Sequence, residues 1–346
     1  MSGAKFKTAV LGATGYAGFE LTRLMLRHSK LAPPLLLSRE SGSHGALEDF
    51  YPQLTGEHLP MEPFSLQLLK SHGVEVLFLA TPHELSRELV PQVLEQGIRV
   101  IDLSGAWRLK CAANRAVYGF SDVDAAVAAK FDAEAVYGLP ELHRDEIRSA
   151  RLVANPGCYA TSIIVALAPL ARAGVIDTAH GVVVDAKSGV SGAGKKPTLK
   201  THFVEAADNL SAYSVFGHRH TGEILEQTGL RGEDVIFTPH LLPIPRGILS
   251  TIYLRLSERS TPADIEKILR EFYAGAAWVR VFSAGVLPQI QHSVHTNYCD
   301  VGFALAEDGK RLILVSCLDN LLKGAAGQAL QNLNVMQGWN EREGLN

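Results

Sequence analysis

Apolar residues in the first hundred positions form short continuous runs, separated by segments with an apolar residue every three or four positions. The runs are typical of buried strands, and the helical spacing, carried first by Ala17, Leu21 and Leu24, is typical of amphipathic helices. Strands are predicted over 5–11, 35–38, 76–80 and 99–102, and helices over 15–27 and 85–96. This alternation predicts a parallel, doubly wound α/β sheet.

The pattern changes after about residue 157. A helix is predicted over 158–172, and four apolar runs follow it before a last helical pattern over 321–336. The runs lie at 182–184, 235–237, 250–256 and 311–316. They indicate a second, mixed sheet, and a chain of 346 residues is long enough for two domains.

Composition and charge exclude several classes of protein. The formal net charge is −3 and the 33 lysines and arginines are scattered, so the basic patch of a nucleic-acid-binding protein is missing. No apolar run approaches the length that spans a bilayer, so we expect a cytoplasmic protein without a membrane partner. The four cysteines are far apart, which argues against a disulfide framework or a structural zinc site.

A glycine-rich loop joins the first predicted strand to the first predicted helix. Glycines there allow a tight turn and close approach of a phosphate, and the free N–H groups of the helix start attract an anion. The same loop could be a turn without a ligand, but its setting favours a dinucleotide. Cofactor contacts are expected from Gly12, Thr14, Gly15, Tyr16, Ala17 and Gly18.

The end of the second strand bears on the choice of cofactor. NAD enzymes usually place an acidic residue there for the ribose hydroxyls, whereas this chain has Ser38 and Arg39. An arginine can pair with a 2′-phosphate and a serine can hydrogen-bond it, so NADP(H) is favoured. Glu40 is adjacent, and the alternative is that Arg39 is only a solvated loop charge.

Cys158 is the candidate nucleophile. It follows Asn155-Pro156-Gly157 and begins the helical pattern over 158–172, so it is expected at a helix N-terminus. There the helix dipole and free N–H groups favour the thiolate, and the same N–H groups could stabilise an oxyanion. A lone cysteine is more often an inert small apolar residue, which is the interpretation for Cys111, Cys299 and Cys317.

Seven segments together resemble the N-acetyl-gamma-glutamyl-phosphate reductase family, relatives of aspartate-semialdehyde and glyceraldehyde-3-phosphate dehydrogenases. The resemblance covers essentially the whole chain. One departure is Gly222, where the family would have proline. The segments are Gly12-Ala-Thr-Gly-Tyr-Ala-Gly18, Ala80-Thr-Pro-His83, Asn155-Pro-Gly-Cys-Tyr-Ala-Thr161, Lys187-Ser-Gly-Val-Ser-Gly-Ala-Gly194, Gly217-His-Arg-His-Thr-Gly-Glu223, Pro239-His-Leu-Leu-Pro-Ile-Pro-Arg-Gly247 and Asp319-Asn-Leu-Leu-Lys-Gly-Ala-Ala-Gly327.

The resemblance implies a fold and an activity. It implies an NADP-binding Rossmann domain over 1–157 with 320–346, and a glyceraldehyde-3-phosphate-dehydrogenase-like catalytic and oligomerisation domain over 158–319. The implied reaction is the NADPH-dependent reduction of N-acetyl-L-glutamyl 5-phosphate to the 5-semialdehyde and phosphate, through a thioester on Cys158. A homodimer or homotetramer is expected.

A histidine of the 217–223 segment is implied to move protons. His218 is our choice, with His220 as the fallback and as a substrate contact. An H-x-H pair can also bind metal, but the reaction needs none and no third ligand is evident, so no metal site is expected.

The remaining contacts are assigned to a glycine-rich loop, two arginines and an asparagine. The loop over 187–194 can surround a ligand with backbone N–H groups, although it could be a flexible surface loop. Either arginine could hold an anionic group or be structural. Expected cofactor contacts are Ser188, Gly189 and Asn320, and expected substrate contacts are Arg108, Ser191, Gly192 and Arg246.

Two rival functions stay open: one differs in the substrate, and the other has no turnover. The first is the same chemistry on aspartyl phosphate or on a carrier-linked aminoadipyl phosphate, although no basic groove for an acidic carrier is evident. The second is a nucleotide-sensing protein without turnover, against which Cys158 and His218 argue, because a pure binder needs neither a thiolate nor a proton carrier.

Overall fold

The computed structural model describes residues 5–39, 45–122 and 124–346. The chain folds into two compact units. Unit 1 contains residues 1–110, 120–156 and 325–346, and unit 2 contains 111–119 and 157–324. The domain limits drawn from the sequence stay a prediction. In the structure, 111–119, Gly157 and 320–324 belong to unit 2.

Unit 1 is built on a parallel sheet, as the strand and helix alternation predicts, and the sheet has seven strands where the sequence indicates four. The strand order is β3-β2-β1-β4-β5-β7-β6, and every pairing is parallel. The strands are β1 Thr8–Leu11, β2 Leu35–Ser38, β3 Met61–Pro63, β4 Val76–Leu79, β5 Arg99–Asp102, β6 Val136–Tyr137 and β7 Leu152–Ala154. β1 and β4 are buried throughout, as expected of strands covered on both faces.

The strand order reverses between β1 and β4. In open α/β sheets, ligands bind outside the carboxyl ends of the strands at such a switch point. The glycine loop follows β1 directly, so the topology places it at the carboxyl edge of the sheet where a dinucleotide binds.

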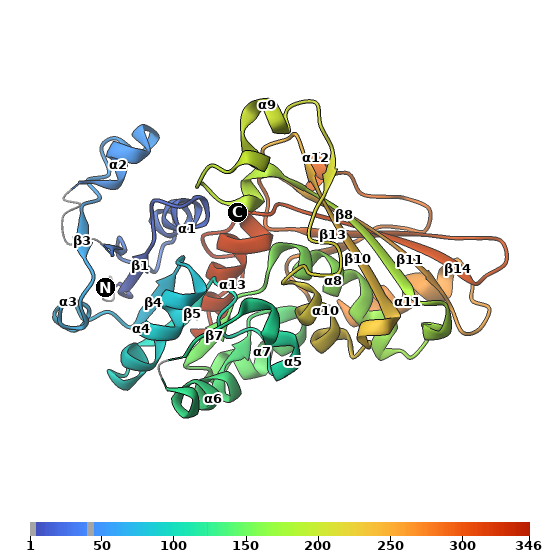
Figure 1. Ribbon diagram of the computed structural model, residues 1–346, viewed down its shortest axis with the longest axis horizontal. Coiled ribbons are helices and arrows are strands. Elements are labelled where there is room, and N and C mark those ends of the chain that lie inside the picture. Colours follow the sequence, from blue (N-terminus) through green and yellow to red (C-terminus); the bar gives the residue numbers. More distant parts are fainter. Residues whose placement is uncertain (1–4, 40–44, 123) are drawn as a thin grey trace. The chain divides into compact units, whose positions relative to one another are not determined.

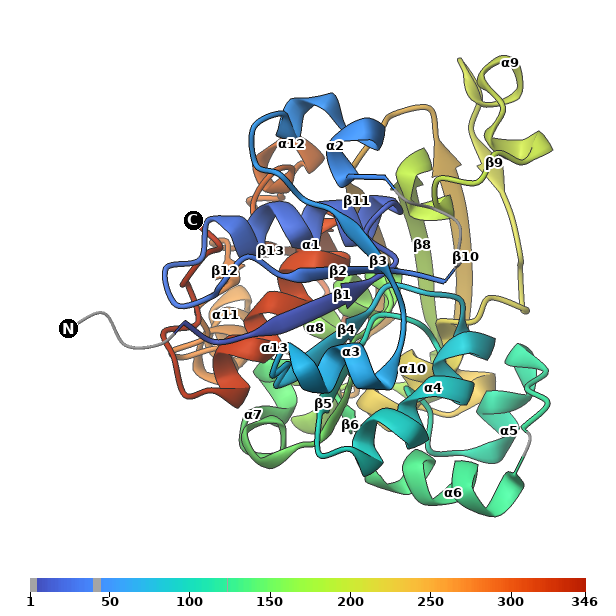
Figure 2. The same cartoon turned by 90° about the vertical axis from the view of Figure 1, so that its left-hand side faces the viewer.

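Helices cover both faces of this sheet (Figures 1 and 2). α1 and α7 pack with α13 on one face, while α3, α4 and α6 lie on the other. These helices are α1 Tyr16–Leu26, α3 Leu66–Ser71, α4 His83–Glu95, α6 Ala125–Glu134, α7 Pro140–Ser149 and α13 Gly327–Met336. α13 is preceded by a π-turn over Leu322–Ala326, and the sequence predicted one continuous helix there.

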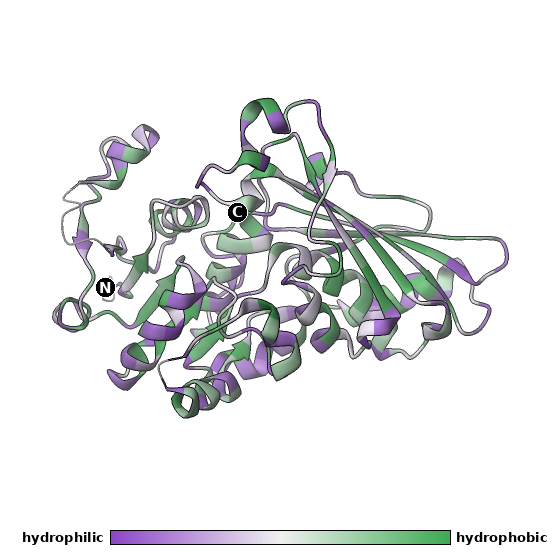
Figure 3. Cartoon of the chain, viewed as in Figure 1, coloured by the Kyte–Doolittle hydropathy of each residue, from purple (hydrophilic) through white to green (hydrophobic). Residues whose placement is uncertain are grey.

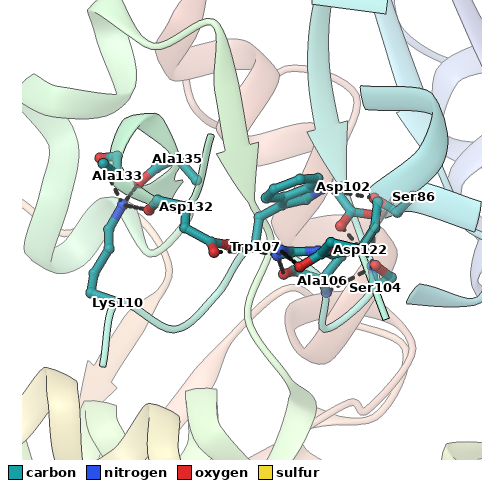
Figure 4. A network of polar contacts seen from close by, with 11 residues as sticks. Ser86, Asp102, Ser104, Ala106, Trp107, Lys110, Asp122, Asp132, Ala133 and Ala135 are labelled. Atoms are coloured by element: carbon teal, nitrogen blue, oxygen red, sulfur yellow. Dashed lines mark hydrogen bonds and ion pairs between the residues drawn. The ribbon is translucent and has the colours of Figure 1, made fainter. Parts of the chain in front are cut away.

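A polar network fastens α4 and α6 to the segment after β5 (Figure 4). The buried Arg87 guanidinium pairs with Asp122 at 2.6 Å and Asp132 at 2.7 Å, and lies 4.3 Å from the Trp107 ring centroid. The ammonium of Lys110 donates to backbone carbonyls at the end of α6, including that of Asp132. These contacts satisfy the C-terminal carbonyls of α6 and hold the 102–110 segment against α4 and α6.

Unit 2 is built on a seven-stranded mixed sheet of order β12-β13-β14-β11-β8-β10-β9. β8 and β10 run parallel, and β11 is antiparallel to both β8 and β14. The strands are β8 Val182–Gly189, β9 Ser211–Ala212, β10 Val235–Leu242, β11 Ile248–Arg255, β12 Val279–Val281, β13 Cys299–Leu305 and β14 Arg311–Leu318. The predicted second, mixed sheet is confirmed, with strands longer than the apolar runs indicate.

The two faces of the mixed sheet differ. α8, Cys158–Arg172, packs on one face and is buried along almost its whole length, with α10 Thr221–Thr228 and α11 Pro262–Phe272 against it. On the other face, apolar side chains remain exposed: Val183, Ile236, Tyr253 and Ile313. Figure 3 shows long hydrophobic-coloured stretches along strands of this sheet, in agreement with the continuous apolar runs at the start of β8 and in the middle of β14. Across the described residues, no helix combines the length and apolar character needed to cross a membrane.

Candidate active site

The glycine loop of unit 1 has the form of a phosphate cradle. Gly12 has φ +95°, and a Cβ there would lie 2.4 Å from the Ala80 carbonyl oxygen, so only glycine fits. A Cβ on Gly18 would lie 2.2 Å from the Gly12 oxygen, which lets α1 approach the loop closely. A Cβ on Gly15, the N-cap of α1, would meet only the Gly12 carbonyl oxygen among the described residues, at an ordinary contact distance of 3.6 Å. These residues fit a pyrophosphate.

The other predicted cofactor residues of unit 1 lie around this loop or at the end of β2. Tyr16 and Ala17 begin α1, and the Thr14 carbonyl accepts a hydrogen bond from the Tyr51 hydroxyl at 2.9 Å. Ser38 ends β2 and Arg39 follows it, exposed, as a 2′-phosphate contact requires. Glu40 lies outside the described residues.

In unit 2, Cys158 is the first residue of α8, as the sequence predicts. Gly157 is the N-cap, with φ −73° and ψ 147°. The thiol is partly buried, in contrast to the buried Cys299 and Cys317 and the exposed Cys111. Gly324 packs against it, since a Cβ there would lie 2.7 Å from the Cys158 Cβ. The sulfur therefore stands at a helix N-terminus, where N–H groups favour an anion.

Gly157 is enclosed by two side chains from the start of α10. The Oε2 atom of the fully buried Glu223 accepts a hydrogen bond from the Gly157 N–H at 2.9 Å. A Cβ on Gly157 would lie only 2.3 Å from Nε2 of His220. The ring of His220 therefore lies against the residue that precedes the nucleophile.

The ring of His218 lies next to that of His220, in an aromatic cluster. Its ring centroid lies 4.7 Å from that of His220 and 5.5 Å from that of Tyr159. Its Nδ1 accepts a hydrogen bond from the His220 backbone N–H at 3.2 Å, which requires that nitrogen to be unprotonated. Burial, with a smaller contribution from Arg219, lowers the pKa of His218 to about 4. His218 is thus neutral near pH 7, with its remaining proton on Nε2.

Two tyrosines border the thiol. The Tyr159 hydroxyl donates to the His240 carbonyl at 2.7 Å, and the Tyr213 ring lies 5.6 Å from that of His218. Burial, and to a smaller extent the charge of Cys158, raises the pKa of Tyr213 to about 12. Tyr213 is therefore protonated and can donate a hydrogen bond.

The 188–192 loop is fixed to the 244–247 loop and to Asn320. Gly189 N–H donates to the Gly247 carbonyl at 2.9 Å. The Asn320 side chain accepts from Gly247 N–H at 2.7 Å and donates to the Ser191 hydroxyl at 2.9 Å. Ser188 is buried, whereas Gly192 is exposed. Asn320 therefore joins the two loops through both ends of its amide.

The two candidate arginines lie in different units and have different partners. Arg246, in unit 2, pairs with the fully buried Asp319 at 3.1 Å. Arg108, in unit 1, is buried and donates to the carbonyls of Asn155 at 2.7 Å and Leu103 at 2.8 Å. Arg108 thus joins the segment after β5 to the residues that lead to the nucleophile.

Sequence reasoning missed Glu223 and Asp319 as functional groups, although both occur in motif segments. A carboxylate in the sequence gives no sign that it will be fully buried. Both are found only from the partners that the fold brings to them: a backbone N–H for Glu223 and a guanidinium for Asp319.

A dinucleotide cradle and a thiol at a helix N-terminus define a nucleotide-dependent oxidoreductase, and the family comparison agrees. Residues 7–150 match the semialdehyde dehydrogenase NAD binding domain, and residues 158–320 match the semialdehyde dehydrogenase dimerisation domain. The chain belongs to the semialdehyde dehydrogenase family.

Curated relatives specify the group within this family. The N-acetyl-gamma-glutamyl-phosphate reductase of Bacillus subtilis (strain 168) is 42% identical over 345 residues, covering 98% of both chains. That of Methanocaldococcus jannaschii is 42% identical over 349 residues, covering 98% of this chain and 97% of the relative. The resemblance to N-acetyl-gamma-glutamyl-phosphate reductases that the motifs indicate is thereby confirmed.

Solved structures confirm the fold. Aspartate semialdehyde dehydrogenase II from Vibrio cholerae has a TM-score of 0.70 at 19% identity, covering 97% of this chain and 99% of that one. Aspartate semialdehyde dehydrogenase with NADP from Candida albicans has a TM-score of 0.71 at 16% identity, covering 96% and 99%.

Proposed function

We propose that the chain catalyses the NADPH-dependent reduction of N-acetyl-L-glutamyl 5-phosphate to N-acetyl-L-glutamate 5-semialdehyde and phosphate, a step of arginine biosynthesis. The observation that carries this proposal is Cys158 at the start of α8, in a chain that is similar over 98% of its length to reductases of that name. Acyl phosphates and thioesters accept a nucleophile or hydride readily, whereas a free carboxylate does not.

The thiol carries the acyl group between two steps. Cys158 Sγ bonds to the acyl carbon, the bond from that carbon to the phosphate oxygen breaks, and the thiol proton leaves with phosphate. NADPH, when bound, supplies a hydride to the resulting thioester. The thiohemiacetal oxyanion then re-forms a carbonyl, the C–S bond breaks, and the thiolate returns. The first N–H groups of α8 stabilise the oxyanions of both steps.

The two histidines divide the proton chemistry. We propose that His220 takes the proton from the thiol and passes it to the departing phosphate, because the His220 ring lies against Gly157. The neutral His218 carries a proton on Nε2 and, with its low pKa, serves as a hydrogen-bond donor to substrate. This reverses our sequence-based order, in which His218 is the first choice and His220 the fallback.

Substrate anions and the cofactor are held by different groups. Arg246 is the proposed ligand of a substrate anion, because it is partly exposed and oriented by Asp319, while Arg108 supports the segment before Cys158. Ser191 and Gly192 remain proposed substrate contacts. For NADPH, the glycine loop holds the pyrophosphate and Ser38 with Arg39 holds the 2′-phosphate; Ser188, Gly189 and Asn320 remain proposed cofactor contacts.

A homodimer or homotetramer completes the proposal. The exposed apolar side chains of the outer sheet face lie in the region that matches a dimerisation domain. Contiguous exposed apolar surface is typical of subunit contacts. We assign this face to contact with a second copy of the chain.

The test is NADP+ reduction by purified protein given N-acetyl-glutamate semialdehyde, with and without phosphate. We expect turnover that requires phosphate and disappears in Cys158→Ser. Turnover with aspartate semialdehyde but not with N-acetyl-glutamate semialdehyde would show that the substrate is another acyl phosphate. NADP+ binding without turnover of either would support the nucleotide-sensing alternative.

A further inference from the structure

The carboxylate of Glu223 binds the backbone next to the nucleophile. Its Oε2 accepts a hydrogen bond from Gly157 N–H at 2.9 Å, and the residue is 0% exposed. Gly157 is the N-cap of α8 and Cys158 is the first helical residue. Glu223 therefore contacts the backbone immediately before the thiol, although it is 66 positions away in the sequence.

Burying a carboxylate is costly unless hydrogen bonds replace its water. Glu223 lies in the first turn of α10, where the helix dipole favours a negative charge. The bond to Gly157 N–H is charge-assisted, a class roughly twice as strong as a neutral hydrogen bond. Glu223 therefore holds the Gly157 N–H firmly, and the backbone at Gly157 sets the direction of the Cys158 side chain.

The start of α10 restrains Gly157 on two sides. His220 is the N-cap of α10, and its Nε2 occupies the place that a Gly157 side chain would need. Glu223, three residues later, holds the Gly157 N–H. A rotation of the backbone at Gly157 would break the bond to Glu223 or press the residue into the imidazole. The thiol and the proposed proton carrier are thus oriented by the same helix end.

We propose that Glu223 is a positioning residue for Cys158, an inference that rests on the function proposed above. It fixes the Gly157 backbone so that the Cys158 sulfur and the first N–H groups of α8 keep the direction that acyl transfer requires. The property that matters is the reach of the side-chain oxygen to Gly157 N–H. Displacing a reacting group by 1 Å can lower a rate by about 10²-fold.

Two substitutions separate reach from charge. Glu223→Gln keeps an oxygen at the same distance along the side chain and loses the charge, whereas Glu223→Asp keeps the charge and retracts the oxygen by one methylene. We expect Glu223→Asp to lower kcat by roughly 10- to 100-fold with little change in KM for NADP+. Glu223→Gln should stay within about 10-fold of wild type, because a neutral hydrogen bond replaces a charged one.

Glu226 provides the matched control. It lies one turn later on α10, where its Oε1 accepts hydrogen bonds from Cys111 N–H and Asn114 Nδ2, both at 2.9 Å. Glu226→Asp makes the same retraction on the same helix, at a hydrogen bond unrelated to the Gly157 backbone. Its kcat should match wild type.

Alkylation of Cys158 by iodoacetamide, followed against pH, provides a readout that needs no substrate. Glu223→Asp should alter the rate and pH profile of alkylation, whereas Glu223→Gln should restore most of the wild-type rate. Wild-type alkylation and kcat in a folded Glu223→Asp, or a larger loss in Glu223→Gln than in Glu223→Asp, would overturn the proposal. If the alkylation rates differ as expected but the protein is inactive on the semialdehyde, the proposed substrate is wrong and the positioning role of Glu223 stands.

Discussion

The imidazole of His220 lies against the α-carbon of Gly157: a Cβ added to residue 157 would lie 2.3 Å from Nε2. Real Cβ atoms essentially never approach a nitrogen so closely, so the glycine and the histidine fix one another. Because Gly157 precedes the nucleophile, this contact places an imidazole beside the turn that carries Cys158.

This contact predicts the effect of Gly157→Ala. The added methyl group must displace the His220 ring, so the protein should fold and bind NADP+ while kcat falls by about 10²-fold, the cost of a shift near 1 Å. Gly232→Ala is the control, because a Cβ there meets nothing nearer than 3.9 Å and φ is ordinary. Equal kcat values for the two variants would contradict the contact.

The low pKa of His218 predicts a loss of stability in acid. Its folded pKa of about 4 lies below the ordinary 6.5, so the unfolded chain binds an extra proton between those values. Stability should therefore fall as pH drops from about 6.5 towards 4, by no more than about 3.5 kcal/mol at ~1.4 kcal/mol per pKa unit. In urea titrations, His218→Asn should flatten this decline, while His58→Asn, at an exposed histidine, should leave it in place.

The exposed Arg39 at the end of β2 predicts the choice of cofactor. Arg39→Ala should raise KM for NADPH by about 10- to 100-fold, since a hydrogen bond to a charged group contributes ~1.5–3 kcal/mol, and should leave KM for NADH almost unchanged. Arg27→Ala, also exposed and in unit 1, is the control. A similar rise for both cofactors would show that Arg39 does not contact the 2′-phosphate.

The outer face of the mixed sheet predicts self-association. Wild-type protein should be larger than a monomer by light scattering, and Ile236→Asp with Tyr253→Asp should release monomers, because an unpaired charge buried in an interface is costly. Val127→Asp, at an exposed position of unit 1, should not change the mass. A monomeric wild type would refute the assignment.

Much of the fold could be predicted from the sequence, because buried strands and amphipathic helices have strong periodic patterns. The sequence does not predict β3, β6, β7, β9, β12 or β13. In β13, Asp300 and Gly302 interrupt the apolar run. The structure explains both, since Asp300 pairs with Arg280 at 2.6 Å and a Cβ on Gly302 would lie 2.4 Å from the Val286 carbonyl oxygen. Tertiary contacts, not local preference, place those residues in a strand.

Some residues of the candidate site could likewise be predicted from the sequence, and others could not. Cys158 and the glycine loop could be predicted because their chemistry depends on a local feature, the N-terminus of the next helix. The roles of His218 and His220 stay a prediction, because both residues lie in one short motif. The fold adds that the His220 ring lies against Gly157, while both rings lie in one aromatic cluster with Tyr159. The partners of Glu223 and Asp319 likewise come from distant segments.

A thioester on Cys158 is the intermediate on which the proposed reaction depends, and the mass of the enzyme during turnover reports it. Protein given NADP+ and N-acetyl-glutamate semialdehyde without phosphate should form about one NADPH per active site and gain one N-acetylglutamyl group on the peptide that contains Cys158. Added phosphate should remove that group. NADPH formation without an acyl adduct, or with an adduct on another residue, would show that Cys158 does not carry the acyl group.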